Sequence, residues 1–141
     1  MPGTATLHER SELDRAVALI VGRLVALGYP KASQFAVRLA VEEAVSNAFH
    51  HGHRGLPAGT PVKLEYTVTP RHVAIAVEDR GPGFNPDAVP DPTLDANLEV
   101  PTGRGIMLMR SYMTTLRYNA VGNRVEMVYH HPAARQSRAV G

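Results

Sequence analysis

The chain has 141 residues, of which 44% are hydrophobic and 20% are charged, and its formal net charge is +2. This length and composition suit one globular domain with a sizeable core. Cysteine does not occur, which excludes disulfides and thiolate metal sites and favours a reducing cytoplasm. Lysine occurs only at Lys31 and Lys63 and the arginines are scattered, whereas nucleic-acid-binding proteins carry a concentrated basic stripe. We therefore expect no direct binding to nucleic acid.

The first ten residues lack the apolar core of a secretory signal. No apolar run reaches the roughly 18 residues that a membrane helix needs. We therefore expect a cytoplasmic protein that does not bind a membrane. Residues 11–130 are expected to form the domain, with an N-terminal segment over residues 1–10 and a flexible tail over residues 131–141.

Two helices are expected in the first third of the chain. Apolar residues recur at helical spacing over residues 11–27, with Ser11 as the expected N-cap and Gly28-Tyr29-Pro30 as the stop. A second helix should begin near residues 32–33 and run to His51, because the glycine that follows is favoured just past a helix C-terminus. Its apolar side consists of Val37, Val41, Ala44, Val45 and Ala48.

The other side of the second helix carries Glu43 and Asn47. They stand four residues apart, so their Cβ atoms lie roughly 5–6 Å apart on one helix face. Ala36 and Ala40 share this side and are expected to leave open space beside the polar pair. A carboxylate can take a proton and an amide oxygen can ligate a hard cation, so the pair could serve a phosphate ester bound through a metal. The alternative is a solvated polar stripe on an ordinary helix.

Two pairs of strand-like runs follow, and each pair predicts an antiparallel hairpin. The first pair is joined by Pro70-Arg71 and the second by the two-residue turn Val121-Gly122. The second run of the first pair, residues 72–79, becomes continuously apolar, which is typical of a central strand buried on both faces. The runs are residues 62–69 with 72–79, and residues 115–120 with 123–130.

A long loop separates the two hairpins. Residues 82–102 contain five prolines and many acidic residues, and a loop of this length is either a functional lid or disordered. The order helix, helix, hairpin, long loop, short helix, hairpin predicts an α+β fold. We expect a two-layer sandwich in which helices pack on one face of a mainly antiparallel, mixed sheet.

A first glycine-containing motif, Asp79-Arg80-Gly81-Pro82-Gly83, directly follows an apolar strand. A carboxylate at a strand end can accept a hydrogen bond from an exocyclic amine such as that of adenine. The two glycines let the backbone pass close to a flat ring. A plain turn is the alternative, because Asp and Gly are common turn residues.

A second motif, Gly103-Arg104-Gly105-Ile106, opens a short helix through Met113. A helix N-terminus offers backbone N–H groups and a positive dipole end to a phosphate, and Arg104 could add a bidentate contact. The Walker pattern GxxxxGK[ST] is absent from the sequence. The alternative is a helix start that happens to contain glycines.

Three neighbouring histidines, His50, His51 and His53, invite a metal interpretation. Consecutive histidines at a helix end rarely converge on one ion, and no Asp or Cys accompanies them locally. Histidine near a helix C-terminus, where positive charge is favoured, is the preferred interpretation.

In this order and spacing, the three motifs resemble those of the GHKL ATPases, the group that contains gyrase-type topoisomerases, histidine kinases and related ATP-binding proteins. The residues around Asn47 and residues 109–113 are most similar to the corresponding segments of the small anti-sigma factor serine kinases. The resemblance runs over roughly residues 11–130. The matching motifs are the N box (Glu43-x-x-x-Asn47), the first glycine box (Asp79-x-Gly81-x-Gly83) and the second (Gly103-x-Gly105-Ile106).

The resemblance implies a Bergerat-type ATP-binding fold and a role for each matching residue. Asn47 would ligate Mg²⁺ that bridges the ATP phosphates, and Glu43 would be the general base that activates the attacking hydroxyl. Asp79 would bind the adenine amino group, with Gly81 and Gly83 shaping that pocket. Residues 84–102 would be the lid, and the remaining nucleotide-binding positions are His51, Gly103, Arg104, Gly105 and Ile106.

The function implied by this resemblance is that of an ATP-binding regulatory serine/threonine kinase and anti-sigma factor. It would transfer the γ-phosphate to a serine on an anti-anti-sigma protein, and a sigma factor would be its other partner. A homodimer is suggested only by the resemblance. Two alternatives stay open: an ATP-dependent binding module without catalysis, and a stand-alone histidine-kinase-like ATPase domain acting in trans.

Two features depart from the family pattern. Many members carry a Gly-Thr pair before the last strand, where the threonine helps to bind the nucleotide, but here the sequence is Gly122-Asn123-Arg124. Only residues 4–7 could supply the N-terminal strand of the family, as a short edge strand. A shortened edge could alter dimerisation.

Overall fold

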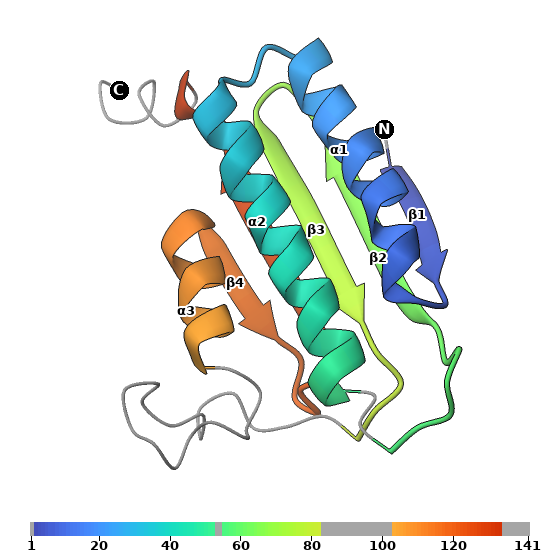
Figure 1. Ribbon diagram of the computed structural model, residues 1–141. Coiled ribbons are helices and arrows are strands. Elements are labelled where there is room, and N and C mark those ends of the chain that lie inside the picture. Colours follow the sequence, from blue (N-terminus) through green and yellow to red (C-terminus); the bar gives the residue numbers. More distant parts are fainter. Residues whose placement is uncertain (1, 53–54, 83–102, 134–141) are drawn as a thin grey trace.

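The computed structural model describes residues 2–52, 55–82 and 103–133, and these form a sheet with helices packed on it (Figure 1). The strand order is β1-β2-β3-β5-β4. The strands are β1 (Pro2–Leu7), β2 (Val62–Val68), β3 (His72–Glu78), β4 (Thr115–Tyr118) and β5 (Arg124–His130). The helices are α1 (Leu13–Ala26), α2 (Lys31–Asn47) and α3 (Gly103–Tyr112).

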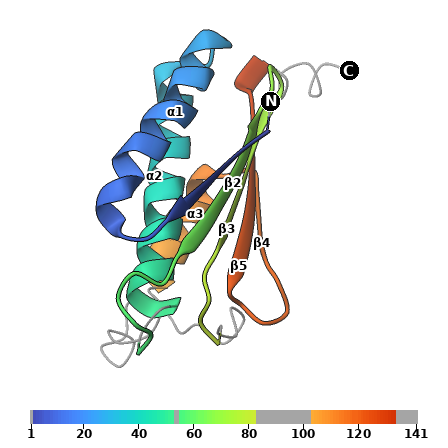
Figure 2. The ribbon, with the colours of Figure 1, turned by 90° about the vertical axis from the view of Figure 1, so that its right-hand side faces the viewer.

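The predicted two-layer α+β architecture is confirmed, since Figure 2 shows all three helices on the same side of the sheet. Both hairpins form where the alternation of residues predicted them. The mixed character does not appear among the described strands, because all four neighbouring pairs are antiparallel. None of the helices in the described ranges is long and apolar enough to cross a membrane.

The core lies between the helices and one face of the sheet. Side chains alternate between the two faces of a strand, and Tyr66, Ile75 and Met127 pair across β2, β3 and β5 on the helix-facing side. They are no more than 6% exposed. The helices contribute the apolar residues expected from their periodicity, including Ile20, Leu24, Val37, Val41 and Val45.

The start of α1 differs from the prediction and its end agrees with it. The N-cap is Glu12, which makes no side-chain capping hydrogen bond, and not Ser11, because a short 3-10 turn precedes the helix. At the C-terminus, the Tyr29 N–H donates to the Leu24 oxygen over 3.0 Å. Gly28 adopts a φ of 79°, the left-handed conformation that glycine supplies after a helix end.

β1 forms one edge of the sheet and is longer than the expected residues 4–7. It runs over Pro2–Leu7 and pairs antiparallel with β2. A Cβ atom at Gly3 would lie 2.5 Å from Cζ of Tyr66, so only glycine lets the strand approach that ring. The guanidinium carbon of Arg23 lies 5.1 Å from the centroid of the same ring, a cation–π contact between α1 and the sheet.

β3 is central in the sheet, but helices cover only one of its faces. The prediction that β3 is buried on both faces is therefore confirmed only in part, because Ala74 on the helix-free face is half-buried while Ala76 is buried. The apolar run is continuous because Ala74 and Ala76 occupy the helix-free face. Ala76 is nevertheless buried, with only 8% of its surface exposed, since its register places it between Glu65 and Glu126 on the neighbouring strands.

Candidate functional site

Glu43 and Asn47 lie in the last turns of α2, where both are half-buried. The α-helix ends at Asn47, and a π-helical turn over Ala48–Gly52 carries the chain on through His51. The helix therefore reaches the predicted end, but in a wider form. Single π-helical turns occur frequently at functional sites.

The face of α2 that carries this pair is not open along its length. Ala36 and Ala40 are 4% and 1% exposed, and α3 packs alongside α2 (Figure 1). The expectation of open space beside them was wrong, because small side chains also allow a second helix to approach closely. The accessible part of this face is confined to its C-terminal end.

The direction of α3 brings its first turn toward the same end of α2. Phe35 near the start of α2 contacts Tyr112 at the end of α3, with ring centroids 5.7 Å apart. At 1.5 Å per residue, Gly103 lies about 14 Å back along α3, while Glu43 and Asn47 lie about 12–18 Å along α2. The backbone N–H groups of the first turn of α3, which have no intrahelical partners, therefore lie toward the polar pair.

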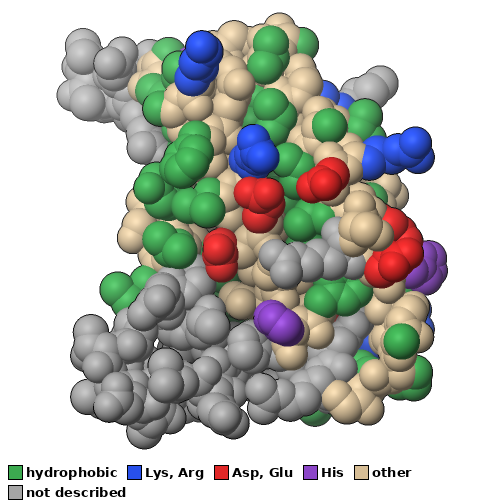
Figure 3. All heavy atoms as spheres, in the orientation of Figure 1, with side chains coloured by type: hydrophobic (Ala, Val, Ile, Leu, Met, Phe, Trp, Pro, Cys, Tyr) green, Lys and Arg blue, Asp and Glu red, His purple; other side chains and the backbone are tan. Residues whose placement is uncertain are grey.

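The outer side of the α2–α3 pair is partly apolar. Phe35, Met107 and Tyr112 are 56%, 54% and 38% exposed. Figure 3 shows hydrophobic side chains along this side of the helical layer and acidic and basic side chains beside them.

The loop after β3 completes this end of the molecule. Asp79 Oδ1 accepts a hydrogen bond from the N–H of Gly81 over 2.7 Å, and the Asp79 N–H donates to the backbone oxygen of Asn123 over 2.9 Å. Figures 1 and 2 show the end of β3, the end of α2 and the β4–β5 turn at the same end of the fold. A carboxylate, an amide and a helix N-terminus that are far apart in sequence thus share one region.

Comparison with known proteins agrees with this arrangement. Residues 8–129 match the histidine kinase-like ATPase domain. The chain belongs to this ATPase family. No curated protein matches the sequence. Domains of this family bind ATP, usually with Mg²⁺, so the ATPase domain described here is an ATP-binding domain.

Asn47 offers a direct test of whether this ATPase domain fits a nucleotide–metal group. Its Nδ2 atom is buried, and within the described ranges it has no hydrogen-bond partner. Buried polar atoms are nearly always paired, and an unpaired one costs free energy. A phosphate oxygen or a metal-bound water would satisfy the nitrogen, while the amide oxygen is a ligand type that Mg²⁺ accepts. The residue therefore fits the group.

The two adjacent glutamates of the ATPase domain have different surroundings. Glu42 Oε1 lies 3.7 Å from Nε of Arg38, one turn earlier on α2. Glu43 has no ion pair or side-chain hydrogen bond with any residue of the described ranges. Of the two carboxylates, the one on the same face as Asn47 is thus the one without a partner among the described residues.

Tyr118, at the end of β4, is a neighbour of the site that the sequence did not indicate. Burial raises the pKa of its phenol to about 12, while Arg110 of α3 lowers it and the Asp79 carboxylate raises it. The pKa of this phenol is thus sensitive to charges from the last turn of α3 and from the loop after β3. No local motif marks this tyrosine, and only its alternation with Leu116 predicts that it faces the helices.

Some predicted site residues lie outside the described residues, and others are described by their backbone alone. Gly83 and the expected lid over residues 84–102 lie outside the described residues. The second glycine motif forms the first turn of α3, so it opens a short helix as expected. Only the backbone is described for His51, Gly103, Arg104, Gly105 and Ile106.

Proposed function

We propose that this ATPase domain is a regulatory serine/threonine protein kinase and anti-sigma factor that phosphorylates a serine of an anti-anti-sigma protein. The observation that carries the kinase part is the pair on α2. Within the described ranges Glu43 has no ion pair or side-chain hydrogen bond, whereas the neighbouring Glu42 lies 3.7 Å from Nε of Arg38. Glu43 stands one turn before Asn47, whose buried Nδ2 has no partner among the same residues. A domain that only bound ATP would need the amide but not the second carboxylate. The nature of the partner and of the sigma factor rests on the sequence resemblance to the anti-sigma factor kinases.

In the proposed reaction, the partner's serine oxygen attacks the γ-phosphorus of ATP. The new bond joins Oγ to phosphorus, the bond from phosphorus to the β–γ bridging oxygen breaks, and ADP leaves. Glu43 accepts the hydroxyl proton. Asp79 accepts a hydrogen bond from the adenine amino group, and the first turn of α3 donates N–H groups to phosphate oxygens. Asn47 would hold Mg²⁺, and the ion would supply charge neutralisation of the phosphates.

A matched pair of variants tests the kinase proposal. The purified protein is incubated with Mg²⁺, γ-labelled ATP and the anti-anti-sigma protein encoded nearest to its gene, and label on the partner is followed. Glu43→Gln should slow transfer about 100-fold or more, because a general base contributes roughly 10²–10⁴-fold. ATP affinity measured by calorimetry should change little, since Glu43 acts on the hydroxyl and not on the nucleotide.

Glu42→Gln is the control, because it removes the neighbouring carboxylate and should leave transfer close to wild type. Equal rates for Glu43→Gln and the wild type would refute the assignment of the base. ATP binding without transfer to the partner by the wild type would favour the non-catalytic binding module instead.

A further inference from the structure

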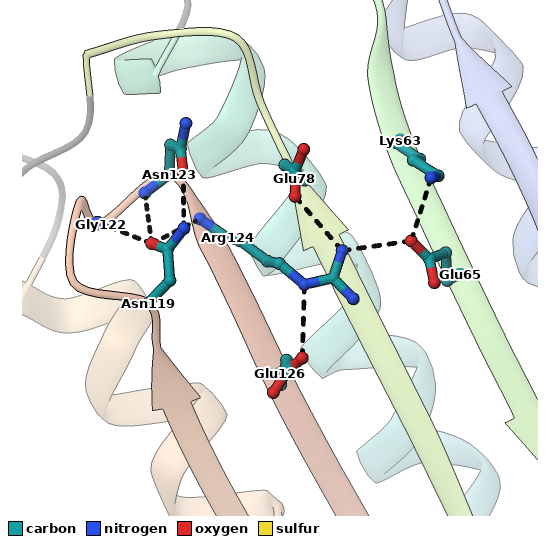
Figure 4. Close-up of polar contacts among 8 residues, drawn as sticks. All are labelled: Lys63, Glu65, Glu78, Asn119, Gly122, Asn123, Arg124 and Glu126. Atoms are coloured by element: carbon teal, nitrogen blue, oxygen red, sulfur yellow. Dashed lines mark hydrogen bonds and ion pairs between the residues drawn. The ribbon is translucent and has the colours of Figure 1, made fainter.

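The turn between β4 and β5 is fixed by one side chain. Asn119 Oδ1 accepts hydrogen bonds from the N–H groups of Gly122, Asn123 and Arg124 over 2.7, 3.0 and 3.3 Å (Figure 4). The Asn119 N–H also donates to the Arg124 oxygen over 2.9 Å. Gly122 has a φ of 86°, which a residue with a side chain rarely adopts. The turn therefore has one well-defined shape.

Asn123 connects this turn to the loop after β3. Its backbone oxygen accepts the N–H of Asp79 over 2.9 Å, and its Nδ2 donates to the backbone oxygen of Gly81 over 3.4 Å. Its Oδ1 accepts a hydrogen bond from Nδ2 of Asn119 over 2.8 Å. Both polar atoms of the Asn123 amide thus have protein partners, which commits this side chain to the fold.

Gly81, which Asn123 contacts, is also hydrogen-bonded to the Asp79 carboxylate. Gly81 is buried, whereas Asp79 and Asn123 are half-buried. The Gly81 N–H donates to Asp79 Oδ1 over 2.7 Å, so the orientation of the carboxylate follows the position of this peptide. Hydrogen bonds weaken steeply when their angle departs from linearity. A shift of Gly81 would therefore misalign a hydrogen bond from the adenine amino group to Asp79.

We propose that Asn123 is a positioning residue for adenine recognition. It holds Gly81, and through Gly81 the Asp79 carboxylate, in the orientation that accepts a hydrogen bond from the adenine amino group. This inference rests on the role proposed for Asp79. It replaces the direct nucleotide contact of the family's threonine by an indirect one, built from the asparagine that stands after Gly122.

Asn123→Asp is the sharpest test, because it keeps the side-chain shape, the acceptor for Asn119 and the backbone contact with Asp79. The donor to Gly81 is replaced by an acceptor oxygen, and a negative charge is added. Calorimetry with ATP, adenosine and GTP should show about tenfold weaker binding of ATP and adenosine, the cost of a misaligned hydrogen bond. GTP lacks the adenine amino group, so its affinity should not change, and the ratio of ATP to GTP affinity should fall about tenfold. Adenosine has no phosphate, so repulsion between the new carboxylate and phosphate groups cannot explain a loss of affinity for this ligand.

Val121→Ala is the control, because Val121 lies in the same turn with 54% of its surface exposed. It should bind all three ligands as the wild type does. Wild-type affinity of Asn123→Asp for adenosine, or an equal loss for ATP and GTP, would overturn the proposal.

Asn123→Ser provides a second variant without added charge, and hydrogen exchange provides a readout without nucleotide. The Gly81 amide should exchange faster in both Asn123 variants than in Val121→Ala, and unchanged exchange would contradict the proposed contact. Neither readout needs phosphate transfer. A wild-type protein that selects adenosine but transfers no phosphate would refute the kinase proposal and leave this inference standing.

Discussion

At the scale of single residues, Asn47 is the proposed metal ligand, but its side chain lowers the stability of the domain without nucleotide. Its buried Nδ2 has no partner in the described part of the chain, and alanine is the better helix former by a few tenths of a kcal/mol. Asn47→Ala should therefore leave the free energy of unfolding without nucleotide within about 1 kcal/mol of wild type. It should lower the Mg²⁺-dependent affinity for ATP about tenfold or more, because the proposed metal ligand is lost. Urea unfolding and calorimetry with and without Mg²⁺ check both expectations. A strongly destabilised variant that kept Mg²⁺-dependent binding would contradict them.

At the scale of elements, the alanines of α2 set how closely α3 approaches. Ala40 is 1% exposed on the side of α2 that α3 covers, so Ala40→Leu has no space for its added atoms. Overpacking should lower the free energy of unfolding by about 1–3 kcal/mol. It should also weaken ATP binding, because α3 carries the second glycine motif in its first turn. Ala32→Leu is the control on the same helix, since Ala32 is exposed. Chemical unfolding and calorimetry measure the two effects. Equal stability of the two leucine variants would show that α3 does not depend on this alanine.

At the scale of the whole molecule, the helix-free face of the sheet is held together by Arg124. Its Nη1 lies 3.1 Å from Glu65 of β2 and 3.3 Å from Glu78 of β3, and its Nε lies 3.3 Å from Glu126 of β5 (Figure 4). Hydrogen bonding to Arg124 lowers the pKa of Glu65 below its usual 4.5. The stabilisation is therefore complete above pH 4.5 and is lost as the pH falls through the lowered value.

Arg124→Gln should consequently lower the free energy of unfolding by about 1 kcal/mol at neutral pH, as expected for a partly exposed network. The difference from wild type should narrow as the pH falls below 4.5. Urea unfolding over a pH series measures it. Arg117→Gln is the control, because Arg117 is 84% exposed and only one contact of 3.9 Å joins it to Glu126. A difference that widened in acid would contradict the sign worked out here.

Local patterns in the sequence predicted most elements of this fold. Helical spacing, the glycine after α1 and the alternation in both hairpins act over a few residues, so a linear chain already contains them. The structure differs from the predictions where contacts with residues distant in the sequence determine the outcome. The first strand was expected only over residues 4–7, but it begins at Pro2 and its Gly3 packs against the ring of Tyr66. The alanines of α2 were expected to border open space, but α3 packs against this helix.

The sequence by itself determined the order of the elements, the α+β class and the three motifs of the ATPase family, because residue type and spacing along the chain encode them. Only the tertiary structure distinguished Glu43 from the paired Glu42 and left the buried Nδ2 of Asn47 without a partner in the described part of the chain. It also joined Asn123 to Gly81, 42 positions apart in the chain. The physical reason is that a hydrogen bond or an ion pair depends on distances of about 3 Å between atoms. The folding of the sheet and the packing of its helices set those distances.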